Sequence, residues 1–284
     1  MQFNIINNII RPLKSIQSNM CKYIGYDKES IFTKFLEYSL SNIYLIKYDA
    51  KQKIINYDLY FHDKPEEFTF IADQINQEYL HSLVYVRNPP PHGIKKEDRF
   101  LIQQKLSKSH VVFQNENLRD SWFGNSNRFS ILEYGIPLLD IGTHNRNSII
   151  VLNYNQSHNL KLLYHNVKQN FPDAAMLESI DSMSYLDICY ILQQYKVCIT
   201  AGDNYNTLCA VANGCKVFSN DLVPNIEYTY FNDLNDIIKL IHKAVQDHHT
   251  IGKLDNIAKY YSIDNFNNTF TSILNNILRK PIIL

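Results

Sequence analysis

The stretch from Lys196 to Asp221, KVCITAGDNYNTLCAVANGCKVFSND, constrains the fold more than any other part of the chain. Val197–Thr200 is a short apolar run of the kind that a buried parallel strand needs. Turn-forming residues follow, and Gly214 lies where the C-terminus of a helix favours a left-handed residue. Lys216–Ser219 is predicted as the next strand. The stretch therefore predicts one strand–helix–strand unit of a parallel α/β sheet.

The loop between Ala201 and Tyr205 leads from the first of these strands into the helix, which Asn206 or Thr207 can cap. In an open α/β sheet, phosphorylated ligands bind at the loop that follows a strand's carboxyl end, against the N-terminus of a helix. The same pattern also fits a buried βαβ unit that binds nothing. This stretch alone leaves both interpretations open.

The composition of the chain excludes some classes of function. The chain has 284 residues, enough for one large or two ordinary domains, and its formal net charge is zero. A neutral chain gives no overall electrostatic case for binding nucleic acid or an anionic membrane. No apolar run approaches the length of a membrane span, so we expect no transmembrane segment.

The N-terminus and the cysteines indicate a reducing compartment. The first residues, MQFNIINNIIRPLK, lack the pattern of a secretory signal, and the five cysteines have no spacing that suits a metal site. We therefore expect reduced thiols, no bound metal and a cytoplasmic location. The abundance of Asn, Ile, Lys and Tyr is typical of AT-rich genomes, so the cytoplasm of a virus- or phage-infected host is one form of this prediction.

Strands and helices alternate through the first half of the chain. The predicted strands are Met1–Ile6, Ile43–Tyr48, Tyr57–His62, Leu83–Arg87, His110–Gln114 and Phe129–Tyr134. The predicted helices are Ile10–Tyr23, Ile31–Leu40, Phe68–Leu80, the amphipathic Lys95–Leu106, and Glu116–Trp122 with Asn115 as its cap.

The second half repeats the pattern after a polar linker at Thr143–Asn147. Its predicted strands are Ser148–Asn153, Ala174–Ile180, Val197–Thr200, Lys216–Ser219 and Ile226–Phe231. Its predicted helices are two that Ser157 and Ser182 cap, the one already described, Asp233–Asp247, and most of Leu254–Leu278. The alternation predicts an α/β protein with two parallel sheets, joined near residue 145.

These segments resemble a known family. The resemblance rests on YDLYFHD, LVYVRNPPP, KSHVVFQNENLRDSW and SILEYGIP in the first half. In the second half it rests on SIIVLNYN, FPDAAMLESI, SYLDICYILQQ, VCITAG, LCAVANGCKVFSND and the helical tail. Together these cover most of residues 40–278 and resemble the nucleotide-sugar glycosyltransferases of the GT-B fold, of the glycosyltransferase group 1 type.

The resemblance implies two Rossmann-like domains with a cleft between them. Residues 1–144 would form the acceptor-side domain, and residues 145–284 the donor-binding domain, with a C-terminal helix that crosses back. The implied activity is transfer of a sugar, such as a hexose, from a UDP- or GDP-linked donor to a hydroxyl of a glycan, a lipid-linked sugar or another acceptor. GT-B members generally act without a metal, so the nucleotide sugar is a co-substrate and no cofactor is expected.

The sequence departs from the family in one respect. Many retaining members carry two glutamates, one before and one inside the helix that ends at Gly214. Alignment on that glycine places Cys209 at the second position, and Ala201 or Gly202 near the first. Either this chain uses Asp203, Asn204 and Asn206 instead, or it has lost donor chemistry and is a non-catalytic sugar-nucleotide or glycan-binding module. The stereochemical outcome and the oligomeric state stay open.

Candidate donor-binding residues lie at the ends of strands in the second half. Amides after Gly202, with Asn206 and Thr207, suit a pyrophosphate, unless the two residues only cap the helix. The resemblance implies a phosphate contact for Lys161, a base contact near Ser179 and a sugar contact for Asp221, each of which could also be an ordinary surface residue. The donor-binding prediction is Asn153, Asn155, Lys161, Ser179, Gly202, Asp203, Asn204, Asn206 and Thr207.

Candidate catalytic and acceptor-side residues lie in the first half. His62 ends a predicted strand and suits proton transfer near neutral pH, and Asp63 beside it could act as a base. A rigid triple-proline loop holds three further polar residues, and another helix N-terminus holds two. These acceptor-side residues are Arg87, Asn88, His92, Asn115 and Arg119, the last of which could compensate negative charge on the donor.

A third interpretation is a phage or viral enzyme that glycosylates a DNA base. Its support is a local basic run, made of Lys95, Lys96, Arg99, Lys105 and Lys108. The neutral net charge counts against nucleic acid as a partner, and such a run is also typical of a solvated helix face.

Overall fold

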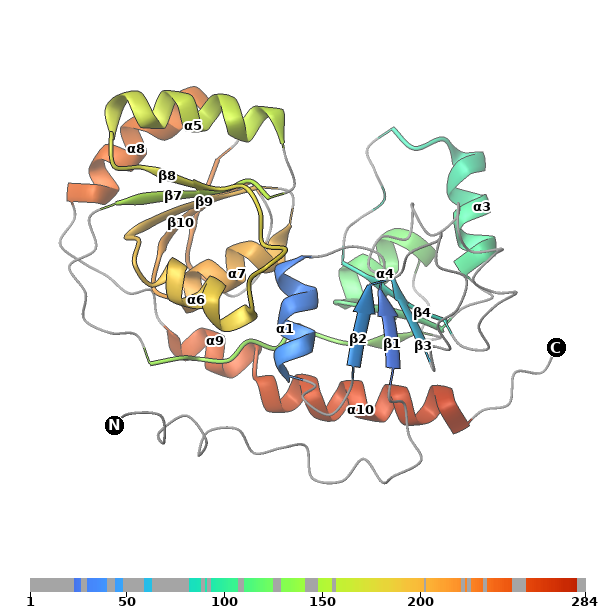
Figure 1. Cartoon of the computed structure of the whole chain (residues 1–284). Helices are drawn as coiled ribbons and strands as arrows, with labels where there is room; N and C mark the ends of the chain where they lie inside the picture. Colours follow the sequence, from blue (N-terminus) through green and yellow to red (C-terminus); the bar gives the residue numbers. More distant parts are fainter. Residues whose placement is uncertain are drawn as a thin grey trace, which may run out of the picture. The chain divides into compact units, whose positions relative to one another are not determined.

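The structure of the chain is a computed structural model (Figure 1). It describes residues 23–26, 30–39, 44–47, 59–62, 82–87, 90, 93–106, 110–124, 129–140, 148–154, 157–201, 203–220, 223, 226–231, 234–246 and 254–279. The described elements fall into two compact units, unit 1 and unit 2. The predicted boundary at residues 144 and 145 lies in residues 141–147, outside the described residues.

Unit 1 is built on a parallel sheet of six strands in the order β2-β1-β3-β4-β5-β6. The strands are β1 Tyr23–Tyr26, β2 Tyr44–Lys47, β3 Leu59–His62, β4 Ser82–Val86, β5 His110–Phe113 and β6 Ser130–Ile131. Every pairing in this sheet is parallel, as the alternation of strands and helices predicted. The predicted strand Met1–Ile6 and the predicted helix Phe68–Leu80 lie outside the described residues.

The sequence prediction was wrong at β1. Tyr23 was assigned to the end of a helix, but it begins a strand that pairs with β2 on one side and β3 on the other. Two rows of backbone hydrogen bonds override the weak local preference of Tyr-Ile-Gly-Tyr, whose Gly25 disfavours a strand.

Helices α3 (Lys96–Leu106), α4 (Glu116–Phe123) and α10 (Ile263–Arg279) complete unit 1. Asn115 caps α4 as predicted, because its Oδ1 accepts a hydrogen bond from Leu118 N at 2.9 Å. A core cluster joins β4, β5, α3 and α4, and it consists of Val84, Val86, Ile102, Val111, Phe113 and Trp122.

The predicted amphipathic pattern of α3 does not match its burial. Ile102 is buried, whereas Phe100 and Leu101 are exposed. The side chains of Arg99 and Gln103 donate to main-chain carbonyls of Ser121 and Trp122, which ties α3 to the end of α4. Of the basic run, Lys95 and Lys96 are exposed, Arg99 is engaged in this way, and the side chains of Lys105 and Lys108 lie outside the described residues.

Unit 2 is built on a parallel sheet of five strands in the order β11-β10-β9-β7-β8. The strands are β7 Ile149–Leu152, β8 Ala175–Leu177, β9 Val197–Thr200, β10 Lys216–Ser219 and β11 Thr229–Tyr230. The helices are α1 Ile31–Ser39, α5 His158–Asn170, α6 Tyr185–Leu192, α7 Asn204–Ala212, α8 Leu234–Gln246 and α9 Leu254–Tyr260. Helices α5 and α8 cover one face of the sheet, and α6 and α7 cover the other (Figure 1).

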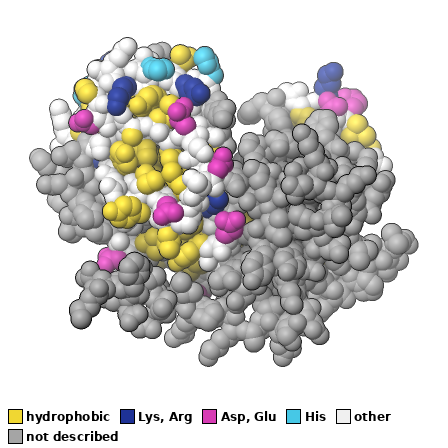
Figure 2. Space-filling view, in the orientation of Figure 1, with side chains coloured by type: hydrophobic (Ala, Val, Ile, Leu, Met, Phe, Trp, Pro, Cys, Tyr) yellow, Lys and Arg dark blue, Asp and Glu magenta, His cyan; other side chains and the backbone are white. Residues whose placement is uncertain are grey.

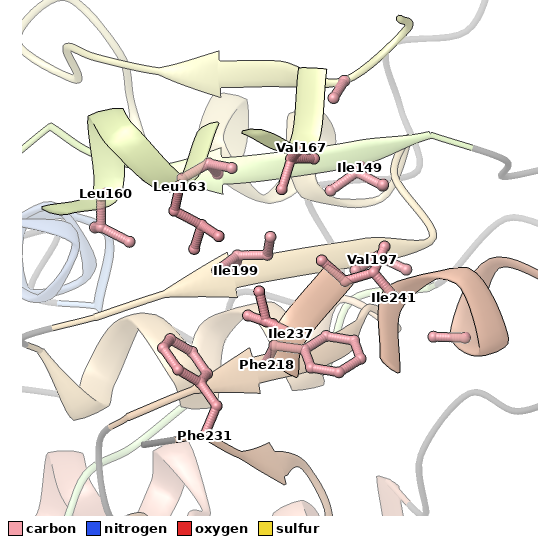
Figure 3. Packing of buried hydrophobic residues seen from close by; sticks show 13 residues of the cluster. Ile149, Leu160, Leu163, Val167, Val197, Ile199, Phe218, Phe231, Ile237 and Ile241 are labelled. Atoms are coloured by element: carbon pink, nitrogen blue, oxygen red, sulfur yellow. The ribbon is translucent and has the colours of Figure 1, made fainter. Parts of the chain in front are cut away.

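The core of unit 2 follows the alternation of side chains along its strands (Figure 3). Ile149 and Val151 of β7, with Val197 and Ile199 of β9, point to the face that α5 and α8 cover. The helices contribute the apolar residues of their 3.6-residue pattern, which are Leu160, Leu163, Val167, Ile237, Ile241 and Ala244. The remaining buried members are Ala174, Phe218 and Phe231.

Helix α1 packs in unit 2, although it lies within residues 1–144 of the chain. Phe32 contacts Tyr134 and Tyr205, with ring centroids 5.6 and 5.1 Å apart. Phe35 contacts Tyr185 and Tyr205 at 5.7 and 5.5 Å. Both phenylalanines are fully buried, so α1 is part of the core of unit 2.

Helix α6 begins two residues later than predicted. Its N-cap is Ser184 and not Ser182, and Ser184 forms a reciprocal capping box with Asp187. The Asp187 carboxylate accepts from the Ser184 backbone N–H at 2.9 Å, while Ser184 Oγ accepts from Asp187 N at 3.2 Å. Met183 N donates to the carbonyl of Ile180, so residues 181 and 182 form a turn before the helix.

We expect the capping box to make folding sensitive to acid. Hydrogen bonds from the backbone and the side chain of Ser184 lower the pKa of Asp187. The unfolded carboxyl has a pKa of about 3.9, so its contribution to stability is present above that pH and is lost as the pH falls through the folded value. In urea titrations, the stability difference between wild type and Asp187→Asn should therefore shrink from pH 6 towards pH 2. Asp173→Asn, in the turn after α5, is the control, and an equal pH dependence in both variants would contradict the assignment.

Candidate functional site

The candidate site is the edge of the unit 2 sheet at which its parallel strands end. Asn153 and Tyr154 follow β7, Asp203 follows β9 and begins α7, and Ser219 ends β10. Since β10, β9 and β7 are neighbours in the sheet, these strand ends lie side by side. Ligands of open α/β sheets bind at this edge.

The start of α7 differs from the sequence prediction. Asp203 is the N-cap, and its side chain accepts from Tyr205 N at 3.0 Å. Asn206 and Thr207, the predicted caps, lie inside the helix and are buried. The turn after β9 is short enough for helical geometry to begin at Asn204, which gives the cap to the preceding aspartate. Gly214 follows α7 with a φ of +79°, as a helix end of this kind requires.

Two tyrosine hydroxyls bind the asparagines in the first turn of α7. Tyr134 donates to Asn204 Oδ1 at 2.5 Å, and Tyr154 donates to Asn206 Oδ1 at 2.7 Å. Neither tyrosine was among the residues predicted from the sequence. Tyr154 lies between two predicted residues, but the pairing with Asn206 spans 52 positions and leaves no local signal.

Thr207 belongs to a buried cluster of three hydroxyls, which we call the hydroxyl cluster. Its Oγ1 lies 2.8 Å from Thr200 Oγ1 and 2.7 Å from Ser219 Oγ, and Thr200 donates to Ser219 at 3.1 Å. All three side chains are fully buried. The cluster links β9, α7 and β10, so Thr207 has a structural contact, and its role in donor binding stays a prediction.

Asn153 has an unusual environment at the end of β7. Its backbone N donates to the carbonyl of Leu177 at 2.9 Å, and its Nδ2 lies 3.7 Å from the sulfur of Met176. Its Oδ1 is buried and has no hydrogen-bond partner. Because buried polar atoms nearly always have a partner, this strand end contains an unmet acceptor.

The other described donor-side candidates lie near β8. Lys161 pairs with Glu178 at 3.8 Å, and both side chains are about half exposed. Ser179 is exposed, and its Oγ accepts from Asp181 N at 3.3 Å. Asn155, Gly202 and Asp221 lie outside the described residues.

Cys209, where the family would place its second glutamate, is fully buried in unit 2. Its Sγ lies 3.7 Å from the hydroxyl of Tyr185 and accepts from Asn213 Nδ2 at 3.7 Å. A hydrogen bond with the Cys189 thiol, and burial, raise the pKa of Cys209, so it remains a neutral thiol. It therefore cannot replace a carboxylate. The first turn of α7 holds no acidic residue, and the carboxylate nearest to it in the sequence is that of the N-cap, Asp203.

The thiols in the described part of the chain are free. Cys189, Cys198, Cys209 and Cys215 are buried and form no disulfide. Within the same described residues, no group of three His, Cys, Asp or Glu side chains could hold a metal ion. None of the helices that the structure describes is long and apolar enough to cross a membrane.

Candidates of the first half lie at one edge of the unit 1 sheet. His62 ends β3, Arg87 follows β4, and Asn115 follows β5, and these three strands are neighbours. Arg87 is buried. Arg119, on α4, is also buried, and its Nε lies 3.0 Å from Asp120 Oδ1. Asp63, Asn88, His92 and the side chain of His62 lie outside the described residues.

Comparison with known proteins supports the fold. No family model and no curated protein sequence matches the chain. HepE of Anabaena, solved in complex with UDP, is 8% identical with a TM-score of 0.54, over 89% of this chain and 92% of that one. A glycosyltransferase of Rickettsia africae is 10% identical with a TM-score of 0.53, over 93% of this chain and all of that one (100%). The chain therefore has the α/β fold of the GT-B glycosyltransferases, as the resemblance implied.

Proposed function

We propose that the chain is a glycosyltransferase that moves a sugar from a nucleotide-sugar donor to a hydroxyl acceptor. The observation that carries the proposal is the polar edge of the unit 2 sheet, where Asn153 and Tyr154 follow β7 and Tyr154 binds Asn206 at the start of α7. The fold adds support, because one solved protein that shares it holds UDP.

The proposed chemistry is metal-independent transfer of a hexose from a UDP- or GDP-linked donor. Negative charge builds on the departing nucleoside diphosphate. The enzyme must therefore hold hydrogen-bond donors and cations in place before the reaction. Arg119 is the proposed cation and Arg87 a proposed acceptor-side residue. His62 with Asp63 is the proposed base that accepts the proton of the acceptor hydroxyl. A glycan is the proposed acceptor, and the proposed location is the cytoplasm.

The first test is thermal stability in the presence of UDP, GDP, ADP, CMP and their common sugar conjugates. A ligand at a hundred times its Kd should stabilise the protein by about 2.7 kcal/mol, because it binds the folded state alone. We expect a clear shift with one nucleotide class, followed by slow hydrolysis of the matching nucleotide sugar. If no nucleotide shifts the melting curve and no nucleotide sugar is hydrolysed, the proposed function is wrong.

A non-catalytic nucleotide-sugar or glycan-binding module is the second candidate. The buried, neutral thiol of Cys209 at a carboxylate position favours it. Both candidates predict ligand binding, and only the enzyme predicts turnover.

A DNA-base glycosyltransferase has less support. Arg99 of its basic run is used inside unit 1, and Figure 2 shows acidic and basic side chains interspersed on the visible face of unit 2.

A further inference from the structure

The start of α7 has the spacing of a capping box but a different set of contacts. In α6, the box is closed, since Ser184 and Asp187 each accept from the other's backbone N–H. In α7, Asp203 is the N-cap and Asn206 is the residue three positions later, which would normally reach back to the N-cap. Instead, Asn206 Oδ1 accepts from the hydroxyl of Tyr154 at 2.7 Å. Tyr154 thus diverts the Asn206 side chain from helix capping.

This hydrogen bond fixes which end of the Asn206 amide faces away from Tyr154. Because Oδ1 is the acceptor for Tyr154, the end that remains for another partner is Nδ2, with its two N–H donors. Asn206 is only 1% exposed, so the surrounding protein restricts its orientation. Asp203, the N-cap of the same helix, supplies a carboxylate acceptor three residues earlier in the chain.

Charge decides which part of a nucleotide sugar suits this pair. Residues 203–207, DNYNT, contain one carboxylate and no lysine or arginine. A diphosphate beside Asp203 would suffer repulsion between like charges. A hydroxyl, by contrast, can accept from Asn206 Nδ2, and a neighbouring hydroxyl can donate to Asp203. A donor and an acceptor at the start of one helix therefore suit two hydroxyls of a sugar ring.

A second observation at the same strand end indicates a missing partner. Asn153, the residue before Tyr154, is buried, and its Oδ1 has no hydrogen-bond partner. Such an atom is rare in folded proteins and requires a partner, which can be a water, an ion or a ligand.

We propose that Tyr154 is a positioning residue that holds the Asn206 amide so that Nδ2 donates to a hydroxyl of the donor's sugar or ribose. This inference rests on the proposed function, since it assumes a nucleotide-sugar ligand at this edge. It assigns the first turn of α7 to hydroxyl recognition and not to the diphosphate.

The test is a double-mutant cycle in ligand affinity. Calorimetry on the full chain gives the Kd of UDP, a UDP-sugar and inorganic pyrophosphate, or of the GDP series where wild type prefers it. The variants are Tyr154→Phe, Asn206→Ala and the double variant. Tyr190→Phe is the matched control, because Tyr190 is 65% exposed on α6.

We expect Tyr154→Phe to raise the Kd of the UDP-sugar roughly 3- to 10-fold, which is the usual effect of one neutral hydrogen bond. The effect should vanish in the Asn206→Ala background, because Tyr154 acts through Asn206.

The outcomes separate the possible ligands. If Tyr154→Phe raises the Kd of the UDP-sugar alone, the hydroxyl that Asn206 binds belongs to the transferred sugar. If it raises the Kd of UDP equally, the hydroxyl belongs to the ribose. Both results support the proposal. An equal effect on pyrophosphate overturns it, as does a Tyr154→Phe variant that binds within twofold of wild type. If Asn206→Ala does not fold, the contrast between Tyr154→Phe and Tyr190→Phe decides. A wild type that binds no nucleotide removes the proposed function and this inference together, whereas a wild type that binds while Tyr154→Phe is unaffected removes the inference alone.

Discussion

Replacing Phe35 with alanine should lower the free energy of unfolding of unit 2 by about 3–5 kcal/mol, the range typical of a buried phenylalanine. The side chain is fully buried in α1 and lies between the rings of Tyr185 and Tyr205. Its removal leaves a cavity between α1 and these residues of α6 and α7. The tyrosines that line this cavity cannot collapse into it freely, because the Tyr205 hydroxyl donates to the carbonyl of Gly135.

The matched control is Phe100→Ala, the same chemical change on α3, where the ring is 63% exposed. Amide exchange in β9 reports on unit 2, and the fluorescence of Trp122, the single tryptophan, reports on unit 1. We expect Phe35→Ala to speed exchange in β9 by several orders of magnitude and Phe100→Ala to leave it unchanged. Equal effects of the two substitutions would show that α1 does not stabilise unit 2.

The assignment of α1 illustrates what periodicity can and cannot predict. The spacing of Ile31, Phe35 and Leu36 identified the helix and its apolar side. It could not identify the surface that the helix would cover. That choice depends on rings that lie 102 to 173 positions away in the chain, such as Tyr134 and Tyr205. The two parallel sheets were predictable because each strand–helix repeat is a local pattern.

Boundaries and short strands were predicted less well, for physical reasons. Ser182 and Ser184 are equally good caps in isolation, and the reciprocal bond with Asp187 selects Ser184. At α7, Asp203 is the N-cap, and it precedes the two predicted caps, Asn206 and Thr207. Strand β1 has four residues and depends on neighbours on both sides, which no local window contains.

The candidate site was predictable in place and less so in detail. Strand ends identified Asn153 and the loop before α7, because parallel strands end at one edge. Contacts across the fold were not predictable. These include the bond of Tyr154 to Asn206, the pairing of Lys161 with Glu178, and the hydroxyl cluster. A polar residue in a sequence gives no indication whether it faces a ligand or another side chain.

Substitution of Thr207 by valine tests whether this residue binds the ligand or only other side chains. Valine keeps the shape of threonine and removes the hydroxyl that lies between Thr200 and Ser219. We expect a loss of about 1–3 kcal/mol in the free energy of unfolding, because valine removes the two buried hydrogen bonds that Thr207 makes to Thr200 and Ser219. The stabilisation that a saturating nucleotide sugar adds should stay equal to that of wild type, since a buried hydroxyl that bonds to β9 and β10 is not needed to hold the ligand.

Urea titrations with and without the nucleotide sugar measure both quantities. Thr229→Val, on the partly exposed edge strand β11, is the matched control and should change stability by less than about 0.5 kcal/mol. In the opposite pattern, Thr207→Val is as stable as wild type, but the nucleotide sugar no longer stabilises it. This pattern would assign Thr207 to the donor and make the hydroxyl cluster part of the binding site. Because the free energy of unfolding falls in one pattern and the stabilisation by ligand falls in the other, one pair of titrations decides whether the start of α7 binds its ligand through Thr207 or through the residues that precede it.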